Sequence, residues 1–152
     1  MTRVWLTPWE WACCGDAFEI GDDVDFGVVA RDPDPVLTDA LGADLLAGVD
    51  AYESHHEEAY ASRVRGRVVA VQEVTQEVIE RAVTLEPSLV ARSDGSAPER
   101  MRLPRETVMI EPVPGTALLA PVRGVGLAPA RQGAPRRSRV GWLVDVEESS
   151  GE

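Results

Sequence analysis

Residues 4–29 read VWLTPWEWACCGDAFEIGDDVDFGVV, and this stretch carries the strongest signal for the fold. It holds three of the four tryptophans, both cysteines and both phenylalanines. Gly15-Asp16 and Gly21-Asp22 are typical turn residues, and the apolar side chains after each of them alternate with polar ones. This pattern predicts short paired strands whose aromatic side chains build the core.

The segment around Trp9 and Trp11 is predicted to be one of these strands. The two rings flank Glu10, which is the spacing of a half-buried strand. Pro8 should separate this strand from a shorter one over residues 4–6, because proline donates no ladder hydrogen bond.

The tryptophans have two interpretations. We expect Trp5, Trp9, Trp11 and Trp142 to form one core cluster, because a chain with 5% aromatic residues needs them for its core. The alternative is that Trp9, Trp11 and Trp142 line a ligand pocket or a partner surface, where aromatic residues are enriched.

The other elements follow from the same periodicities. Residues 63–77 give the clearest strand, in which Gly66 permits a bulge or a close backbone approach. Residues 78–85 fit either a further strand or a helix. Leucines at helical spacing predict a helix over 39–48, with Thr38 as its N-cap. Further strands are predicted at residues 18–20, 24–28, 107–111, 116–120 and 139–146.

These elements predict a mainly β fold with one short helix, either a small barrel of the SH3-like or OB-like kind or a rolled antiparallel sheet. A length of 152 residues suits a single domain, placed at residues 1–148. Few apolar side chains anchor the Pro/Gly/Arg-rich segments near 88–105 and 122–138, so we expect both to be flexible. Residues 149–152 are expected to form a disordered tail.

Composition bears on compartment. No window approaches roughly 18 uninterrupted apolar residues, so we expect no membrane span. The first residues lack the charged and apolar regions of a secretory signal. The only cysteines, Cys13 and Cys14, are adjacent and form no disulfide framework, which agrees with a reducing compartment. We therefore expect a cytoplasmic protein.

Charge is unevenly distributed. All 15 basic residues are arginine, and the formal net charge is −11. Residues 1–62 carry a net charge of −12, whereas residues 91–140 carry +5. The acidic first half argues against nucleic-acid binding, since phosphate contacts need clustered cations. We expect the arginines of 91–140 to face the acidic half of the chain, with anion binding as the alternative.

The Cys13-Cys14-Gly15 sequence has three interpretations. The first is a buried thiol packed among aromatic rings, since free cysteine behaves as a small hydrophobe. The second is a metal site, and the third is a redox thiol pair. Zinc sites usually space their cysteines two to four residues apart, which favours the first interpretation.

The only histidines, His55 and His56, lie together among glutamates. Thiolates and imidazoles suit zinc, so Cys13, Cys14, His55 and His56 are a candidate four-ligand zinc site. The alternative, which we prefer, is a solvated acidic loop. The carboxylates of Asp22, Asp23 and Asp25 form a weaker candidate cation cluster. It is weaker because neighbouring side chains on a strand point to opposite faces.

One set of motifs resembles a known family. It consists of Trp-Ala-Cys-Cys-Gly at residues 11–15, the pair His55-His56, and Arg-Gly-Arg-Val at residues 65–68. These motifs are similar to a family of small proteins from high-GC bacteria that is known only as a domain of unknown function. The resemblance covers about the first half of the chain. It implies a compact mainly β domain, without an activity or a partner.

The sequence contains no nucleophile elbow, P-loop or dinucleotide-binding motif, and we assign no catalytic residue. The preferred function is a non-enzymatic cytoplasmic binding or interaction module with a protein partner. The first alternative is a zinc-binding or thiol-dependent protein. The second is a small-molecule-binding β-barrel with tryptophans in its mouth.

Overall fold

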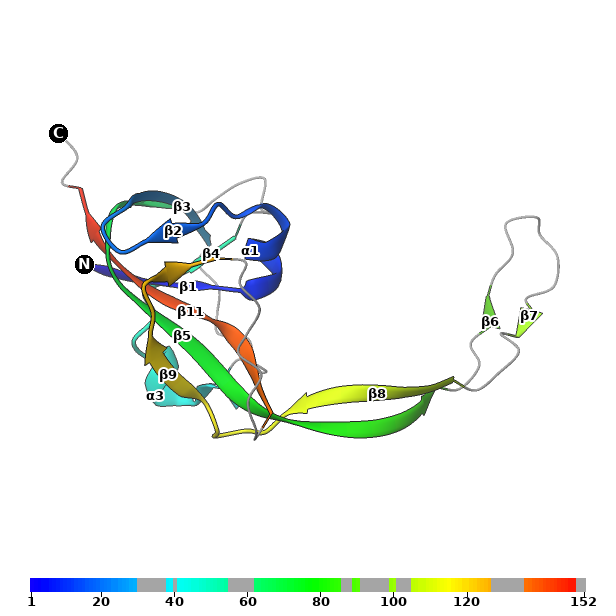
Figure 1. Ribbon diagram of the computed structural model, residues 1–152. Coiled ribbons are helices and arrows are strands. Elements are labelled where there is room, and N and C mark those ends of the chain that lie inside the picture. The colour runs from blue at the N-terminus through cyan, green and yellow to red at the C-terminus, as the bar shows by residue number, and fades with distance from the viewer. Residues whose placement is uncertain are drawn as a thin grey trace.

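The computed structural model describes residues 1–29, 38–39, 41–54, 62–85, 89–90, 99–100, 105–126 and 136–149. The chain is mainly β, with a seven-stranded mixed sheet and two short helices, α1 (Pro8–Cys14) and α3 (Ala43–Leu46) (Figure 1). The sheet contains β1 (Thr2–Leu6), β3 (Asp23–Val29), β4 (Ala51–Glu53), β5 (Ser62–Leu85), β8 (Arg105–Pro112), β9 (Leu118–Pro121) and β11 (Arg137–Glu148). Two small strand pairs join β2 (Phe18–Glu19) to β10 (Gly124–Val125), and β6 (Leu89–Val90) to β7 (Glu99–Arg100).

Strand β5 is the central strand of the sheet, with which most of the other strands pair. It is 24 residues long, and β11 pairs antiparallel along one of its edges from Gly66 to Glu77. Strands β3, β9 and β8 follow one another along β5, each of them antiparallel to it. The predicted strand over 63–77 is confirmed, and residues 78–85 continue it as a strand and not as a helix.

The strands close a ring of hydrogen bonds. Strand β11 pairs with β1, β1 with β4, β4 with β3, β3 with β5, and β5 again with β11. The sheet is mixed and not purely antiparallel as predicted, because β4 runs parallel to β1 while it pairs antiparallel with β3. Arg3 and Asp145 lie opposite each other on β1 and β11, and their side chains join at 2.6 and 2.9 Å.

Helix α1 replaces the strand predicted around Trp9 and Trp11, and that prediction was wrong. Pro8 occupies the first turn of the helix, where its missing N–H leaves no intrahelical bond unmade. Residues two apart on a helix point to nearly opposite sides, whereas on a strand they share one face. Trp9 is therefore 63% exposed and Trp11 only 5% exposed, a difference that fits the helix and not a half-buried strand.

The predicted helix over 39–48 is confirmed in part. Residues 38–39, 41 and 43–46 are helical, but Gly42 adopts a φ of 78° and interrupts the run. The Gly42 N–H donates to the Thr38 carbonyl at 2.8 Å, which makes a single turn before α3. Leu41 and Leu46 are both buried, so the amphipathic pattern itself is correct.

The sheet buries side chains on both of its faces. One cluster contains Val4, Leu6, Trp11, Phe18, Phe26, Val68, Trp142 and Val144, among others. The second contains Trp5, Leu41, Leu46, Val74 and Leu143. Successive strand residues point to opposite faces, so β1 and β11 each supply both clusters. The expected single cluster of four tryptophans was wrong.

The last third of β5 projects away from the ring as part of a two-stranded arm (Figure 1). We define the arm as residues 78–85 of β5 and 105–112 of β8, which pair in continuous antiparallel register. The predicted strands over 107–111 and 116–120 correspond to β8 and to β9. The flexibility expected for 88–105 and 122–138 stays a prediction, because large parts of both segments lie outside the described residues.

Candidate functional site

The predicted thiol–imidazole site is described only at Cys13. This cysteine is a free thiol, exposed near the end of α1. The Cys14 side chain, His55 and His56 lie outside the described part of the chain. Within that part, no three histidine, cysteine or acidic side chains gather closely enough to hold a metal ion. The zinc site therefore stays a prediction.

The tryptophans proposed as a ligand or partner surface divide between core and solvent. Trp11 and Trp142 are buried in the same cluster, whereas Trp9 is exposed. The Trp11 ring meets Phe18 edge-on at a centroid distance of 5.3 Å and Phe26 at 6.2 Å. Such edge-to-face contacts add to the packing of a core. Two of the three rings are thus buried in the core, and Trp11 also borders the concavity described next.

A shallow concavity of about 430 Å³ lies over these rings, lined partly by Asp16, Asp22, Asp23 and Asp25. Most of its carboxylates are already engaged. Asp25 binds Arg63 at 2.6 Å and Arg65 at 3.0 Å, and these contacts lower the pKa of its carboxyl group. Asp22 accepts a hydrogen bond from the Glu19 N–H at 2.8 Å. This use of the carboxylates within the fold weighs against the cation cluster.

The arginines of 91–140 only partly face the acidic first half as predicted. Arg123 pairs with Glu19 at 2.8 Å, as expected. The side chains of Arg136, Arg137 and Arg139 instead pair with glutamates of β5. They do so because β11 runs antiparallel beside β5, so the arginines at and just before its start lie close to Glu73, Glu77 and Glu80.

The surface that sequence reasoning missed is on the arm. Val108, Met109 and Ile110 are consecutive on β8, and they are 57%, 48% and 62% exposed. Ile79 on the facing strand is also exposed, whereas the exposed Leu118 and Leu119 lie on β9, outside the arm. Successive residues of β8 point to opposite faces, so both faces of the arm carry exposed large apolar side chains, which often mark interaction surfaces. The signal in the sequence was the apolar run Val-Met-Ile inside a predicted strand.

The outer edge of β8 is open in the described part of the chain, where β8 pairs only with β5. The Val113 N–H donates to the Glu77 carbonyl at 2.8 Å, which fixes the direction of the groups on β8. By the alternation of an antiparallel ladder, Glu106, Val108, Ile110 and Pro112 turn their backbone groups outward. Pro112 has no N–H and therefore loses nothing at this outer position.

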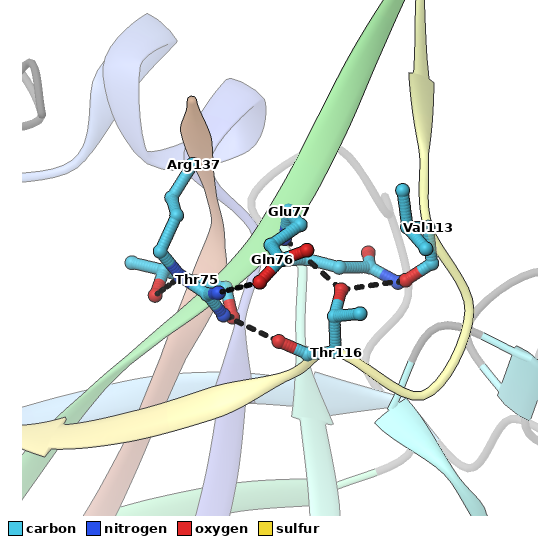
Figure 2. A network of polar contacts seen from close by, with 6 residues as sticks. All are labelled: Thr75, Gln76, Glu77, Val113, Thr116 and Arg137. Carbon is cyan, nitrogen blue, oxygen red and sulfur yellow. Dashed lines mark hydrogen bonds and ion pairs between the residues drawn. The ribbon is translucent and has the colours of Figure 1, made fainter. Parts of the chain in front are cut away.

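A network of hydrogen bonds holds the base of the arm (Figure 2). Arg137 on β11 donates to the Thr75 carbonyl at 3.1 Å and to the Thr116 carbonyl, and it pairs with Glu77 at 3.2 Å. Buried Gln76 donates to the Val113 carbonyl at 2.9 Å. These bonds tie β11 and β5 to the turn between β8 and β9, where Gly115 has a φ of 74°. The arm therefore leaves the body in a fixed direction.

These features define a class of small mainly β protein, with a ring of paired strands and a clamped apolar arm. The chain belongs to a protein family of unknown function, DUF6578, whose family model matches residues 1–148. This match also covers the arginine-rich second half, which the sequence motifs alone did not reach. No curated protein and no solved structure matches the chain. No helix in the described ranges is long and apolar enough to cross a membrane.

Proposed function

We propose that the protein is a non-enzymatic interaction module and that its arm is the docking element. The observation that carries the proposal is the exposed run of Val108, Met109 and Ile110 beside the open edge of β8. A two-stranded ribbon with apolar side chains in water is at best marginally stable on its own, so a further strand or surface stabilises it. Strand addition to an open sheet edge is a common mode of protein recognition.

The ring supplies the rigid support that such a module needs. The finer proposal for the fold is a small barrel, closed through β11 and filled by side chains such as Val68 and Val144. The hydrogen bonds of Arg137 then hold the base of the arm against the ring, because they join β11 and β5 to the turn after β8. An exposed free thiol at Cys13 agrees with the proposed cytoplasmic location, where thiols stay reduced.

Site-specific photo-crosslinking tests the docking role. A photoreactive phenylalanine analogue at Met109 should form adducts in cells, whereas the same analogue at Ile20 should not. Ile20 is a matched control, because it is an exposed apolar side chain on the body of the protein. Equal adduct yields at the two positions, or none at Met109, would contradict the proposal.

A further inference from the structure

The outer edge of β8 is complementary to itself. We propose that two copies of the chain join through this edge as an antiparallel pair, with Met109 opposite Met109 of the second copy. This inference rests on the proposed docking role of the arm and names its occupant. It turns two two-stranded arms into one four-stranded sheet, ordered β5–β8–β8–β5.

The backbone geometry supports this register. A two-fold axis perpendicular to the sheet pairs residues of the same parity, so Val108 meets Ile110 of the second copy. Both residues turn their N–H and C=O groups outward, so each pair exchanges two hydrogen bonds, and the symmetry repeats them. The Glu106 N–H meets the carbonyl of Pro112, which is the only ladder group that a proline offers. The missing N–H of Pro112 thus falls at the end of the new ladder.

The side chains support the same register. The apolar run Val108, Met109 and Ile110 overlaps completely with its own copy. Thr107 falls opposite Glu111, and Glu106 falls opposite Pro112, so no like charges face each other. Like charges directly opposite are destabilising, and this register contains none. The other edge of β5 is less suitable, because Glu80 and Arg81 interrupt the apolar residues of its arm segment, which contains no run of three.

The shape of the molecule removes the electrostatic objection to a dimer. The chain carries a net charge of −11, so two bodies in contact would repel each other. Met109 lies three residues from Pro112 at the base of the arm, about 10 Å at the rise of a strand. The two bases are then roughly 20 Å apart, well beyond a Debye length of about 8 Å at physiological salt. The projection of the arm therefore keeps the acidic bodies apart (Figure 1).

Sedimentation velocity on the purified chain tests the proposal through the residue at the two-fold axis. The wild-type chain should show concentration-dependent association to twice the mass of the single chain. Met109→Lys and Met109→Glu should each stay monomeric, because like charges then face each other across the axis. An equal mixture of the two variants should regain the dimer, because an ammonium then faces a carboxylate.

Two further variants distinguish pairing through the strand edge from nonspecific apolar association. Ile110→Pro removes an outward N–H that β5 does not use, so it should abolish dimerisation and leave thermal unfolding nearly unchanged. Leu118→Lys changes an equally exposed apolar residue on β9 and should leave the dimer intact. Circular dichroism of every variant shows whether the chain remains folded.

A wild-type chain that stays monomeric at all concentrations would overturn the proposal, as would a variant mixture that fails to associate. A different result would contradict the docking role, because crosslinking at Met109 in cells tests that role. A monomeric chain that still crosslinks to another protein through Met109 refutes self-pairing and leaves the docking role standing. A chain that neither associates nor crosslinks refutes both.

Discussion

The indole ring of Trp5 lies directly against the backbone of Gly141, on the face of the sheet that α3 covers. A methyl group on Gly141 would come within 2.5 Å of Trp5 Cζ2, closer than carbon atoms approach each other. Gly141→Ala should therefore lower the free energy of unfolding by about 1–3 kcal/mol, the usual cost of overpacking. Urea denaturation at constant temperature measures this difference.

Gly126 is the matched control for this substitution. A methyl group there meets nothing within 4 Å, and the residue has no positive φ, so Gly126→Ala should leave stability nearly unchanged. Equal stability of the two variants would show that β1 and β11 separate readily enough to admit the methyl group.

The pair between Asp25 and Arg63 should make stability depend on pH. The hydrogen bond from Arg63, reinforced by Arg65, lowers the pKa of Asp25 below its unfolded value. The stabilisation is therefore fully present above the unfolded pKa, near pH 4, and is lost as the pH falls through the lowered folded pKa. Because both partners are more than 40% exposed, Asp25→Asn should cost less than about 1 kcal/mol at neutral pH.

Urea denaturation of the wild-type chain and of Asp25→Asn measures this effect at about pH 7 and about pH 2. The difference in unfolding free energy should shrink at the lower pH, because protonation of the carboxyl group weakens its pairing with Arg63. A difference of the same size at both values would mean that Asp25 acts through packing and not through its charge.

Arg137 should control the rigidity of the arm. Arg137→Met removes the bonds to Thr75 and Thr116 and the pair with Glu77. Since a hydrogen bond to a charged group contributes about 1.5–3 kcal/mol, amide exchange at Val113 should accelerate by at least about tenfold. Hydrogen–deuterium exchange followed by mass spectrometry or NMR measures this rate.

Arg123→Met is the comparison for that experiment. Arg123 is also an arginine paired with a glutamate, but its side chain is 86% exposed and its partner, Glu19, lies on β2. Exchange at Val113 should be unchanged in this variant. Accelerated exchange in both variants would assign the effect to net charge and not to the clamp.

Trp9 should account for the quencher-accessible fluorescence of the protein. Trp5, Trp11 and Trp142 are buried, whereas Trp9 faces solvent on α1. Acrylamide should therefore quench the wild-type emission in two phases, and Trp9→Phe should abolish the accessible phase. An unchanged accessible phase in that variant would mean that another indole reaches solvent.

The sequence alone predicted an element correctly where its apolar residues fit the period of one kind of secondary structure and not of another. The alternation in β3 and β11 and the β-branched run in β5 each predict a strand, and Gly66 does lie against the backbone of Glu147. The prediction failed at α1 because the spacing of Trp9 and Trp11 was assigned to one face of a strand, whereas the helix points the two rings to nearly opposite sides. Pro8 was read as the end of a strand, although proline also favours the first turn of a helix.

The candidate site was harder to predict, because it depends on pairing between distant segments. Val108, Met109 and Ile110 are visible in the sequence as an apolar run inside a strand. Whether that strand lies inside a sheet or at its edge depends on what residues 78–85 form. These residues fit the period of a strand and that of a helix, so the sequence does not decide between the two positions. The open edge follows only from the register of the complete sheet.

The pairing of β1 with both β4 and β11 has a consequence for synthesis of the chain. Translation delivers β1 first and β11 last among the strands of the ring, so the gap between β1 and β5 stays open until residues 137–148 leave the ribosome. Until then β11 does not cover Val4 and Leu6, and the nascent chain exposes these apolar side chains to solvent. Emergence of β11, and not of any single hairpin, is the event that completes the ring, which makes a premature stop before β11 a route to aggregation.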